Sequence, residues 1–209
     1  METGRQPSMS TRPWFASSLR VLVRESFETI ILALLVFMVL HLSIQNYKVE
    51  GPSMEPTLNQ NEYLIVNKLV YLRFDPAEVI DALPFYDGGA DETDRYIFHP
   101  PVRGEVVVFR SPRDQSRDFV KRVIGLPGET VEIVNGTVYV NGLELVEPYL
   151  DGKDNTTMAP VQVDQGTVFV LGDNRGASND SRSWGPVPTE NLIGRAWMRF
   201  WPLDHLGVL

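Results

Sequence analysis

The sequence predicts a mainly β domain preceded by one N-terminal helix that is apolar enough to cross a membrane. Eleven apolar residues run without interruption from Ile30 to Leu40. After residue 45 the sequence changes to short runs rich in β-branched and aromatic residues, with Asn-Gly and Pro-Gly turn signals between them. Many short strands with little helix favour a β-barrel or a β-sandwich.

The N-terminal segment predicts an uncleaved transmembrane helix. As a helix, Phe27–Ile44 spans about 27 Å at ~1.5 Å per residue, close to the ~30 Å of a hydrocarbon core. A cleaved signal peptide is the alternative, but no small-x-small cleavage site follows in Gln45–Lys48. Residues 1–26 carry four arginines against two glutamates, which favours a cytoplasmic N-terminus.

We therefore predict a cytoplasmic tail at 1–25, a transmembrane helix at 26–45 and an extracytoplasmic β-rich domain at 46–209. The expected strands are Glu62–Asn67, Glu105–Phe109, Phe119–Ile124, Thr130–Ile133, Thr137–Val140 and Thr167–Leu171. Asn135-Gly136 between two of them predicts a two-residue hairpin. Prolines, glycines and acidic residues predict a surface insertion at 75–101, and 150–160 predicts a shorter loop.

The composition excludes several classes of function. A net charge of -8 argues against nucleic acid as a partner, because phosphate contacts need a basic face. The absence of cysteine excludes disulfides and thiolate nucleophiles. The three histidines, at 41, 99 and 205, match no metal-ligand spacing, so we expect no catalytic metal.

Ser53, in the segment Gly51-Pro52-Ser53-Met54-Glu55-Pro56-Thr57, is a candidate nucleophile. The two prolines predict a stiff, largely extended backbone that would aim the hydroxyl and its neighbouring N–H groups. Stiffness suits a nucleophile, because both groups must be placed before the substrate arrives. An ordinary turn serine is the alternative, and this segment alone favours it.

Lys121 is a candidate base because it lies in the most apolar predicted strand of a chain with four lysines and fifteen arginines. On a two-residue period it shares a face with Phe119 and Val123. Burial there would disfavour the charged amine, lower its pKa and make it a competent general base. In the opposite arrangement Lys121 faces solvent and Arg122 faces a carboxylate, and periodicity leaves both open.

A third polar segment, Gly172 to Arg182, follows a predicted strand and is dense in Asp, Asn, Ser and Arg. Such a loop can satisfy its own polar groups through side-chain-to-backbone bonds and Asp–Arg pairs. One of its hydroxyls could also hold an amine base in place. No serine–histidine pair is convincing, so lysine is the better candidate base.

In this order, and behind a membrane anchor, these segments resemble the bacterial type I signal peptidase family. The resemblance covers most of residues 25–200 and rests on four motifs taken together. They are Gly51–Leu58, Arg103–Phe109, Phe119–Glu129 and Gly172–Arg182.

The resemblance implies roles for individual residues. Ser53 matches the nucleophile, with its backbone N–H as an oxyanion donor, and Lys121 matches the general base. Ser178 matches the hydroxyl that orients the base amine. Asp180 and Arg182 match a supporting ion pair, and Asp173 a nearby structural carboxylate.

Gly51 departs from part of the family, in which a serine at this position helps to bind the oxyanion. The second oxyanion donor is therefore open: a water or the Gly51 backbone. The single span and the short 150–160 loop are typical of a compact member.

By this resemblance the chain is a serine endopeptidase that removes signal peptides from exported preproteins after small residues, at Ala-X-Ala type sites. The resemblance also implies that it uses neither a metal nor a cofactor. Its expected partners are preprotein signal peptides and the lipid bilayer. Its expected location is the bacterial plasma membrane, as a single-pass monomer with the catalytic domain outside. Trp197, Trp201 and Met54 are candidates either to contact the bilayer or to lie in the core.

Two rival interpretations are a non-catalytic anchored β-domain and a self-cleaving Ser/Lys repressor-type peptidase. The first leaves a lysine in an apolar strand unexplained. The second requires a DNA-binding domain, whereas a short tail and an apolar span precede the strands here.

Overall fold

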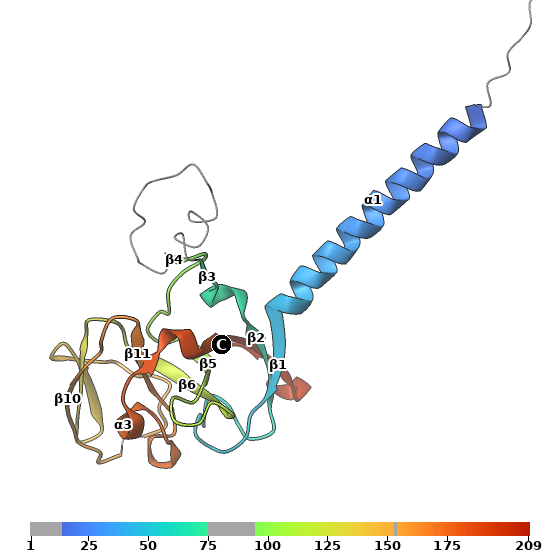
Figure 1. Ribbon diagram of the computed structural model, residues 1–209. Helices are drawn as coiled ribbons and strands as arrows, with labels where there is room; N and C mark the ends of the chain where they lie inside the picture. Colours follow the sequence, from blue (N-terminus) through green and yellow to red (C-terminus); the bar gives the residue numbers. More distant parts are fainter. Residues whose placement is uncertain (1–13, 75–94, 153) are drawn as a thin grey trace, which may run out of the picture. The chain divides into compact units, whose positions relative to one another are not determined.

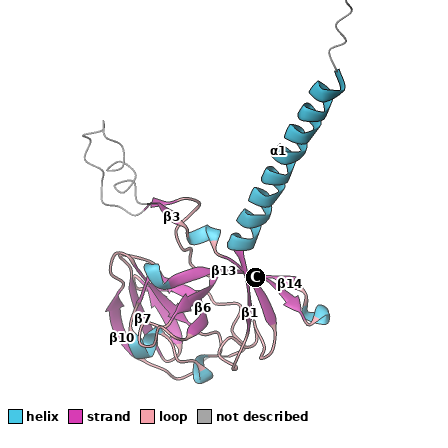
Figure 2. Cartoon of the chain, turned by 45° about the vertical axis from the view of Figure 1, so that its right-hand side comes forward, coloured by secondary structure: helices cyan, strands magenta, loops and turns pink. Residues whose placement is uncertain are grey.

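The computed structural model describes residues 14–74, 95–152 and 154–209 (Figure 1). The chain divides into a helical unit that ends at Leu42 and a β-rich unit, Ser43–Leu209. Among its described residues, the β-rich unit contains one four-residue α-helix and a few short 3-10 segments between its strands (Figure 2). The predicted fold class, mainly β with one apolar N-terminal helix, is confirmed.

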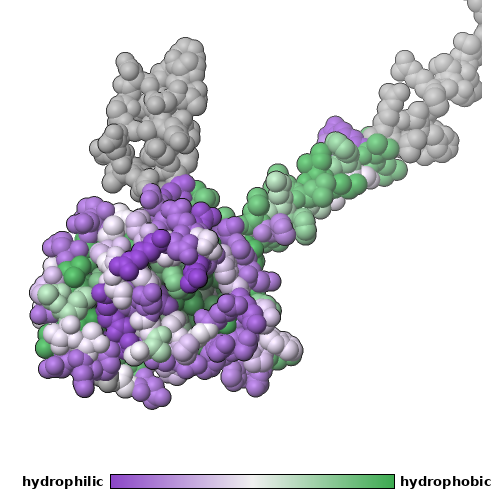
Figure 3. Space-filling model, turned by 60° about the horizontal axis from the view of Figure 1, so that its bottom comes forward, coloured by the Kyte–Doolittle hydropathy of each residue, from purple (hydrophilic) through white to green (hydrophobic). Residues whose placement is uncertain are grey.

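The helix α1, Trp14–Ser43, begins inside the stretch predicted as a tail and is longer than expected. Arg24 and Glu28, one helical turn apart, form a 2.7 Å ion pair that supports this polar part of the helix. Val21–Ser43 has a mean hydropathy of 2.0 and is long and apolar enough to cross a membrane. Figure 3 shows its surface as largely hydrophobic, in contrast to the visible face of the β-rich unit. Residues 1–13 of the predicted tail lie outside the described residues.

The main sheet of the β-rich unit is antiparallel and has the strand order β1-β2-β13-β5-β6-β11-β12, with β14 paired to β13. Its strands are β1 Ile44–Lys48, β2 Tyr63–Asn67, β5 Val106–Arg110, β6 Asp118–Gly125, β11 Thr167–Leu171, β12 Val187–Pro188, β13 Leu192–Trp201 and β14 Gly207–Val208. The α3 helix, Ser181–Trp184, lies between β11 and β12.

A second, four-stranded sheet has the order β10-β7-β8-β9. Its strands are β10 Met158–Gln162, β7 Thr130–Val134, β8 Thr137–Val140 and β9 Leu143–Glu144. The predicted Asn135-Gly136 hairpin is confirmed: both residues have positive φ, and Val134 pairs with Thr137. A two-stranded ribbon, β3 Arg73–Phe74 with β4 Arg95–Tyr96, completes the described strands.

The six predicted strands are present within one or two residues of their expected ends. The sequence did not predict the longer strands β1, β10 and β13 or the two-residue strands β3, β4, β9, β12 and β14. β13 mixes glycine and arginine with aromatic residues and shows no clean alternation, since its register shifts at several points. The predicted loop at 150–160 is too long at its C-terminal end, because β10 already begins at Met158. That strand tolerates Pro160 because it lies at the edge of its sheet and bulges there. Most of the predicted insertion at 75–101 lies outside the described residues.

The core cluster that supports the candidate site lies beneath the segment 51–58. Met54 and Leu58 are fully buried against Leu64 and Val66 of β2 and against Val106 and Val108 of β5. Met54 is therefore a core residue, whereas Trp197 and Trp201 are each about half exposed. Two buried anchors in one short segment fix the polar residues between them.

Candidate active site

The segment that carries Ser53 is a pair of tight turns rather than the extended backbone expected from its prolines. The Glu55 N–H donates to the Pro52 carbonyl at 3.1 Å, and the Leu58 N–H donates to the Met54 carbonyl at 2.9 Å. Pro52 is compatible with the first turn because only its carbonyl is needed there. The buried side chains of Met54 and Leu58 hold both turns, and Ser53 lies half-buried beside them.

The strand β6 presents Lys121 and Arg122 to different partners. The Lys121 Nζ lies 2.8 Å from the Ser53 Oγ and 2.8 Å from the Val120 carbonyl oxygen. Arg122 donates from Nε and Nη2 to the two carboxylate oxygens of Asp173, at 2.9 and 2.6 Å. The first of the two arrangements that periodicity left open, with a buried lysine, is therefore found. The second is wrong for the lysine and right only in that the arginine faces a carboxylate.

Lys121 is only 2% exposed, and burial lowers the pKa of its amine to about 8. The negative charges of Asp180 and Asp173 act in the opposite direction, and the positive charge of Arg182 reinforces the shift. Neutral and charged amine are therefore both accessible near neutral pH, which is the condition for a general base.

Asp173 is the centre of a buried polar network. The Thr57 hydroxyl donates to Asp173 Oδ2 at 2.5 Å and accepts from Arg122 Nη2 at 3.2 Å. Arg122 also donates to the Gly104 carbonyl at 2.7 Å and lies over the ring of Tyr149, 4.0 Å from its centroid. Because Thr57 belongs to the Ser53 segment and Arg122 follows Lys121, this network links the two candidate catalytic segments.

Asp180 and Arg182 form the predicted ion pair, with Nε and Nη2 of the arginine 2.8 and 2.9 Å from the carboxylate. Asp180 is fully buried and also accepts the Gly172 N–H at 3.0 Å. Arg182 donates in addition to the carbonyls of Arg175 and Ser178 and to Asp154. The pair therefore fixes the loop that carries Ser178.

Ser178 does not form the expected hydrogen bond to Lys121. Its hydroxyl is buried and has no hydrogen-bond partner among the described residues. It packs against Gly172, where an added Cβ would overlap both the Ser178 hydroxyl and the Ser53 carbonyl oxygen. The Ser53 carbonyl also accepts the Asn174 N–H at 3.1 Å. Ser178 thus lies beside the Ser53 backbone, with a hydroxyl free to bind.

A cavity of about 230 Å³ opens beside Ser53 and Lys121, and we call it the β1–β6 cavity. One wall is the end of β1 and the residues after it, Tyr47–Glu50, and the other is Asp118–Lys121 of β6. Leu64 and Val108 contribute apolar surface to it. The outer edge of β1 is unpaired in the described sheet, and β11 pairs with β6 only from Arg122 onward. Both walls therefore offer free backbone groups.

The three histidines have partners other than Ser53. His41 stacks on Phe37 in α1, and His99 bonds the Pro100 carbonyl. His205 Nδ1 lies 2.7 Å from Glu62. Among the described residues no group of three or more His, Asp or Glu side chains is arranged to hold a metal ion.

The structure adds residues whose roles the sequence did not reveal, chiefly Thr57, Tyr149 and Glu147. Thr57 lies inside a quoted motif, but nothing in that motif indicates its bonds to Asp173 and Arg122. Glu147 accepts hydrogen bonds from Tyr149 and Arg175, in a stretch without any recognisable pattern. Such contacts depend on tertiary folding alone.

Comparison with known proteins identifies the family of the chain. The family profile described as "Signal peptidase, peptidase S26" matches residues 23–201. The chain is 35% identical over 195 residues to the probable signal peptidase I-1 of Synechocystis sp., covering 90% of this chain and 87% of that one. It is 37% identical over 176 residues to signal peptidase I of Bacillus caldolyticus, covering 78% and 82%.

A further relative is signal peptidase I of Leptolyngbya laminosa, 38% identical over 183 residues, with 82% of this chain and 78% of that one covered. A crystal structure of a signal peptidase I from Enterococcus faecalis is 37% identical and covers 46% of this chain and 97% of that one, with a TM-score of 0.41. The family profile and the sequence relatives span most of the chain. The chain therefore belongs to the signal peptidase family, peptidase S26.

Proposed function

We propose that this chain removes signal peptides from exported preproteins, with Ser53 as the nucleophile and Lys121 as the general base. The observation that carries the proposal is the 2.8 Å separation between the Lys121 amine and the Ser53 hydroxyl. The amine is buried, and its pKa is lowered to about 8. Family membership supports the same chemistry.

In this mechanism the neutral Lys121 amine accepts the Ser53 proton while the Ser53 oxygen attacks the carbonyl carbon of the scissile bond. The Ser53 backbone N–H stabilises the oxyanion, and the second donor is left open by Gly51. The C–N bond breaks, Lys121 passes its proton to the leaving amine, and an ester joins Ser53 to the signal peptide. Lys121 then deprotonates a water that hydrolyses the ester and restores the serine.

The supporting residues hold this pair in place. Asp173 and Arg122 lock the strand that carries Lys121, while Asp180 and Arg182 lock the loop that carries Ser178. The free Ser178 hydroxyl supplies a bond to the amine when Ser53 has become an ester. These roles are positional, because none of the four charged groups bonds the Ser53 hydroxyl or the Lys121 amine in the structure.

The signal peptide binds in the β1–β6 cavity as an extended strand. Its backbone pairs with the free edges of Tyr47–Glu50 and Asp118–Lys121. Apolar side chains such as Leu64 and Val108 in a cavity of about 230 Å³ favour small residues before the scissile bond. This geometry supports cleavage at Ala-X-Ala type sites.

The helix α1 anchors the chain in the bacterial plasma membrane, with the N-terminus cytoplasmic and the β-rich unit outside. Its support is the apolar length of Val21–Ser43 and the arginines that precede it. An anchor confines the enzyme to the membrane where its substrates are inserted.

The test uses the full chain in detergent micelles, incubated with a purified preprotein that has an Ala-X-Ala site. We expect one cut after the second alanine, identified by mass spectrometry of both products. Ser53→Ala, Lys121→Ala and Lys121→Arg should each abolish it, the last because arginine does not deprotonate. Cleavage by purified Lys121→Ala protein would overturn the assigned base. An intact preprotein with wild-type enzyme would favour the non-catalytic domain, and cleavage of the chain itself would favour the repressor-type peptidase.

A further inference from the structure

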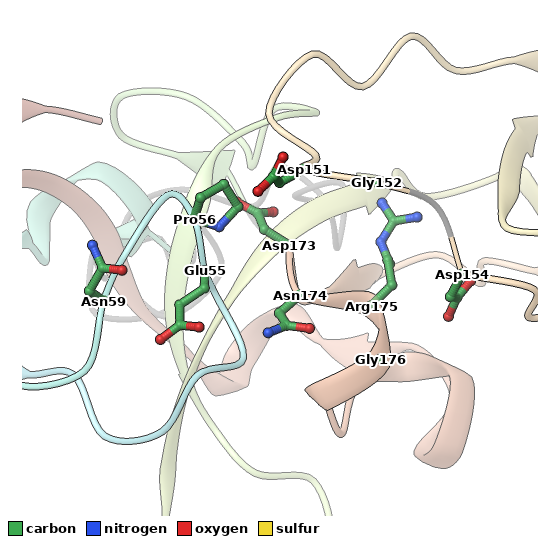
Figure 4. A pocket seen from close by; sticks show the side chains of 10 residues that line it. All are labelled: Glu55, Pro56, Asn59, Asp151, Gly152, Asp154, Asp173, Asn174, Arg175 and Gly176. Atoms are coloured by element: carbon green, nitrogen blue, oxygen red, sulfur yellow. The ribbon is translucent and has the colours of Figure 1, made fainter.

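A second and larger cavity, of about 440 Å³, lies on the residues that continue the Ser53 segment (Figure 4). Glu55 and Pro56 line it from that segment, Asp151 from the loop before β10, and Asn174 and Arg175 from the loop after β11. We call it the acidic cavity. Nothing in the proposed mechanism uses it.

The acidic cavity is connected to the nucleophile through the backbone. Ser53 lines the β1–β6 cavity, and Glu55, two residues later, lines the acidic cavity. The Ser53 carbonyl accepts its 3.1 Å hydrogen bond from Asn174, which also lines the acidic cavity. The two cavities therefore meet the same turn two residues apart. This adjacency is the basis for extending a peptide bound in the first cavity past Ser53 into the second.

Two of the carboxylates in this cavity are unpaired. Asp173 is paired with Arg122, and Asp154 shares Arg182 with Asp180. Glu55 and Asp151 have no ion pair or side-chain hydrogen bond among the described residues. The space in front of them is therefore negatively polarised and favours a positive or hydrogen-bond-donating group.

Arg175 provides a second and independent indication of a ligand. Its side chain is 4% exposed, and it holds Glu147 and the Gly172 carbonyl, but its Nη1 is buried without any acceptor among the described residues. In Figure 4 its guanidinium extends toward the Asp151–Gly152 side of the cavity. A buried donor without a partner is unfavourable, and a peptide carbonyl is the acceptor that a bound chain would bring.

We propose that the acidic cavity binds the first residues of the mature protein, those that follow the scissile bond, and selects basic or neutral side chains over acidic ones. This inference rests on the proposed function. Peptide carbonyls satisfy Arg175, and Glu55 and Asp151 face the side chains and the amino group that the cut releases. Cleavage turns a neutral amide into an amine that becomes protonated, so the same carboxylates attract the new N-terminus.

The experiment uses the full chain in detergent micelles and quenched fluorescent peptides with one signal sequence. Lys, Gln or Glu is placed in turn at the first, second or third mature position. We expect kcat/KM for the Lys peptide to exceed that for the Glu peptide about tenfold at one position or more, with the Gln peptide between them. Raising the salt concentration should reduce the ratio, because exposed charges are screened.

The charge-removing variant is Glu55→Gln combined with Asp151→Asn, and the matched control is Glu190→Gln, an exposed carboxylate on the segment Thr189–Asn191. The double variant should bring the Lys-to-Glu ratio close to one, while the control keeps the wild-type ratio. Asp151→Asn alone changes one exposed loop residue and should lower the Lys-to-Glu ratio about threefold. This single variant keeps the test valid if the double variant does not fold.

The inference is wrong if the wild-type ratio is near one at all three positions, or if Asp151→Asn and the double variant both keep it. In either case Ser53-dependent cleavage of the Gln peptides would leave the proposed function standing. Failure of the wild type to cut any peptide would instead remove the proposed function, and the inference with it.

Discussion

Lys121 and Arg122 are consecutive residues of β6 that hold two different loops. The Lys121 amine lies 2.8 Å from Ser53 Oγ, and the Arg122 guanidinium makes a two-pronged pair with Asp173. The strand alternation that sends one side chain to each partner also ties the Ser53 segment to the 172–182 loop. The distance between the Lys121 amine and the Ser53 hydroxyl therefore depends on Arg122 and Asp173, which take no part in the reaction.

The pH dependence of cleavage should follow the Lys121 amine. Its pKa is lowered to about 8, and only the neutral form accepts a proton. We expect kcat/KM to fall about tenfold per pH unit below that value and to level off above it. Initial cleavage rates of a quenched fluorescent peptide between pH 6 and 10 measure this dependence of kcat/KM on pH. A profile that continues to rise to pH 10 would show that the base is an ordinary exposed lysine.

Replacement of Lys121 by methionine should stabilise the β-rich unit while abolishing activity. The unfolded chain binds the lysine proton up to about pH 10.5, whereas the folded protein releases it above about 8. The amine therefore destabilises the fold fully below pH 8, and this penalty diminishes as the pH rises toward 10.5. We expect a gain of about 2 kcal/mol at pH 7, after loss of the amine's hydrogen bonds, and less at pH 10.

Thermal unfolding of the full chain in detergent, followed by tryptophan fluorescence at both pH values, tests this expectation. Lys68→Met, on a half-buried residue outside the site, is the matched control. An equal or lower midpoint for Lys121→Met at pH 7 would contradict a desolvated amine.

Gly172→Ala should damage catalysis more than stability. A Cβ at this position would overlap the Ser178 hydroxyl and the Ser53 carbonyl oxygen, so the two serines must move apart. We expect kcat/KM to fall at least about 100-fold, because small displacements of a nucleophile are costly, and the fold to lose about 2 kcal/mol. In the control Gly207→Ala the nearest atoms lie 3.9 Å away, so near-normal activity is expected there. Near-normal kinetics of Gly172→Ala would show that this close approach does not position Ser53.

Thr57 should matter through its hydroxyl. Thr57→Val keeps the shape but leaves Asp173 and Arg122 each without one hydrogen bond. We expect a loss of about 2 kcal/mol in stability and a lower kcat with an unchanged KM. Thr57→Ser should restore most of both. If valine and serine give the same kinetics, the hydroxyl has no part in aligning the Ser53 segment.

The sequence predicted the parts of this protein that have strong local patterns. The apolar helix, the six strands and the Asn135-Gly136 hairpin follow from periodicity and turn chemistry. Strand β13 was missed, because its arginines and glycine sit in a register with bulges that only its neighbours impose. The Ser53 segment was expected to be extended, but the buried Met54 and Leu58 side chains fold it into turns.

The sequence named most residues of the candidate site, but it did not predict the hydrogen bonds that join segments far apart in the chain. Ser53 and Lys121 are 68 residues apart, and no local pattern states that they meet. The Asp180–Arg182 pair lies within one loop and was expected, whereas the Thr57–Asp173 bond spans 116 residues and was not. The resemblance implied a bond from the Ser178 hydroxyl to the Lys121 amine, whereas in the structure this hydroxyl lies beside Gly172 and the Ser53 carbonyl oxygen and has no partner among the described residues.

The most direct test of this account is the titration of Lys121 itself. The chain has four lysines, so 13C labelling at lysine Cε gives few signals, and the one that Lys121→Met removes is assigned. We predict that this signal in the full chain titrates near pH 8, well below the ~10.4 of a lysine side chain in water. If the Lys121 signal titrates at that ordinary value instead, the amine is hydrated and charged at neutral pH, and it is not the base that activates Ser53.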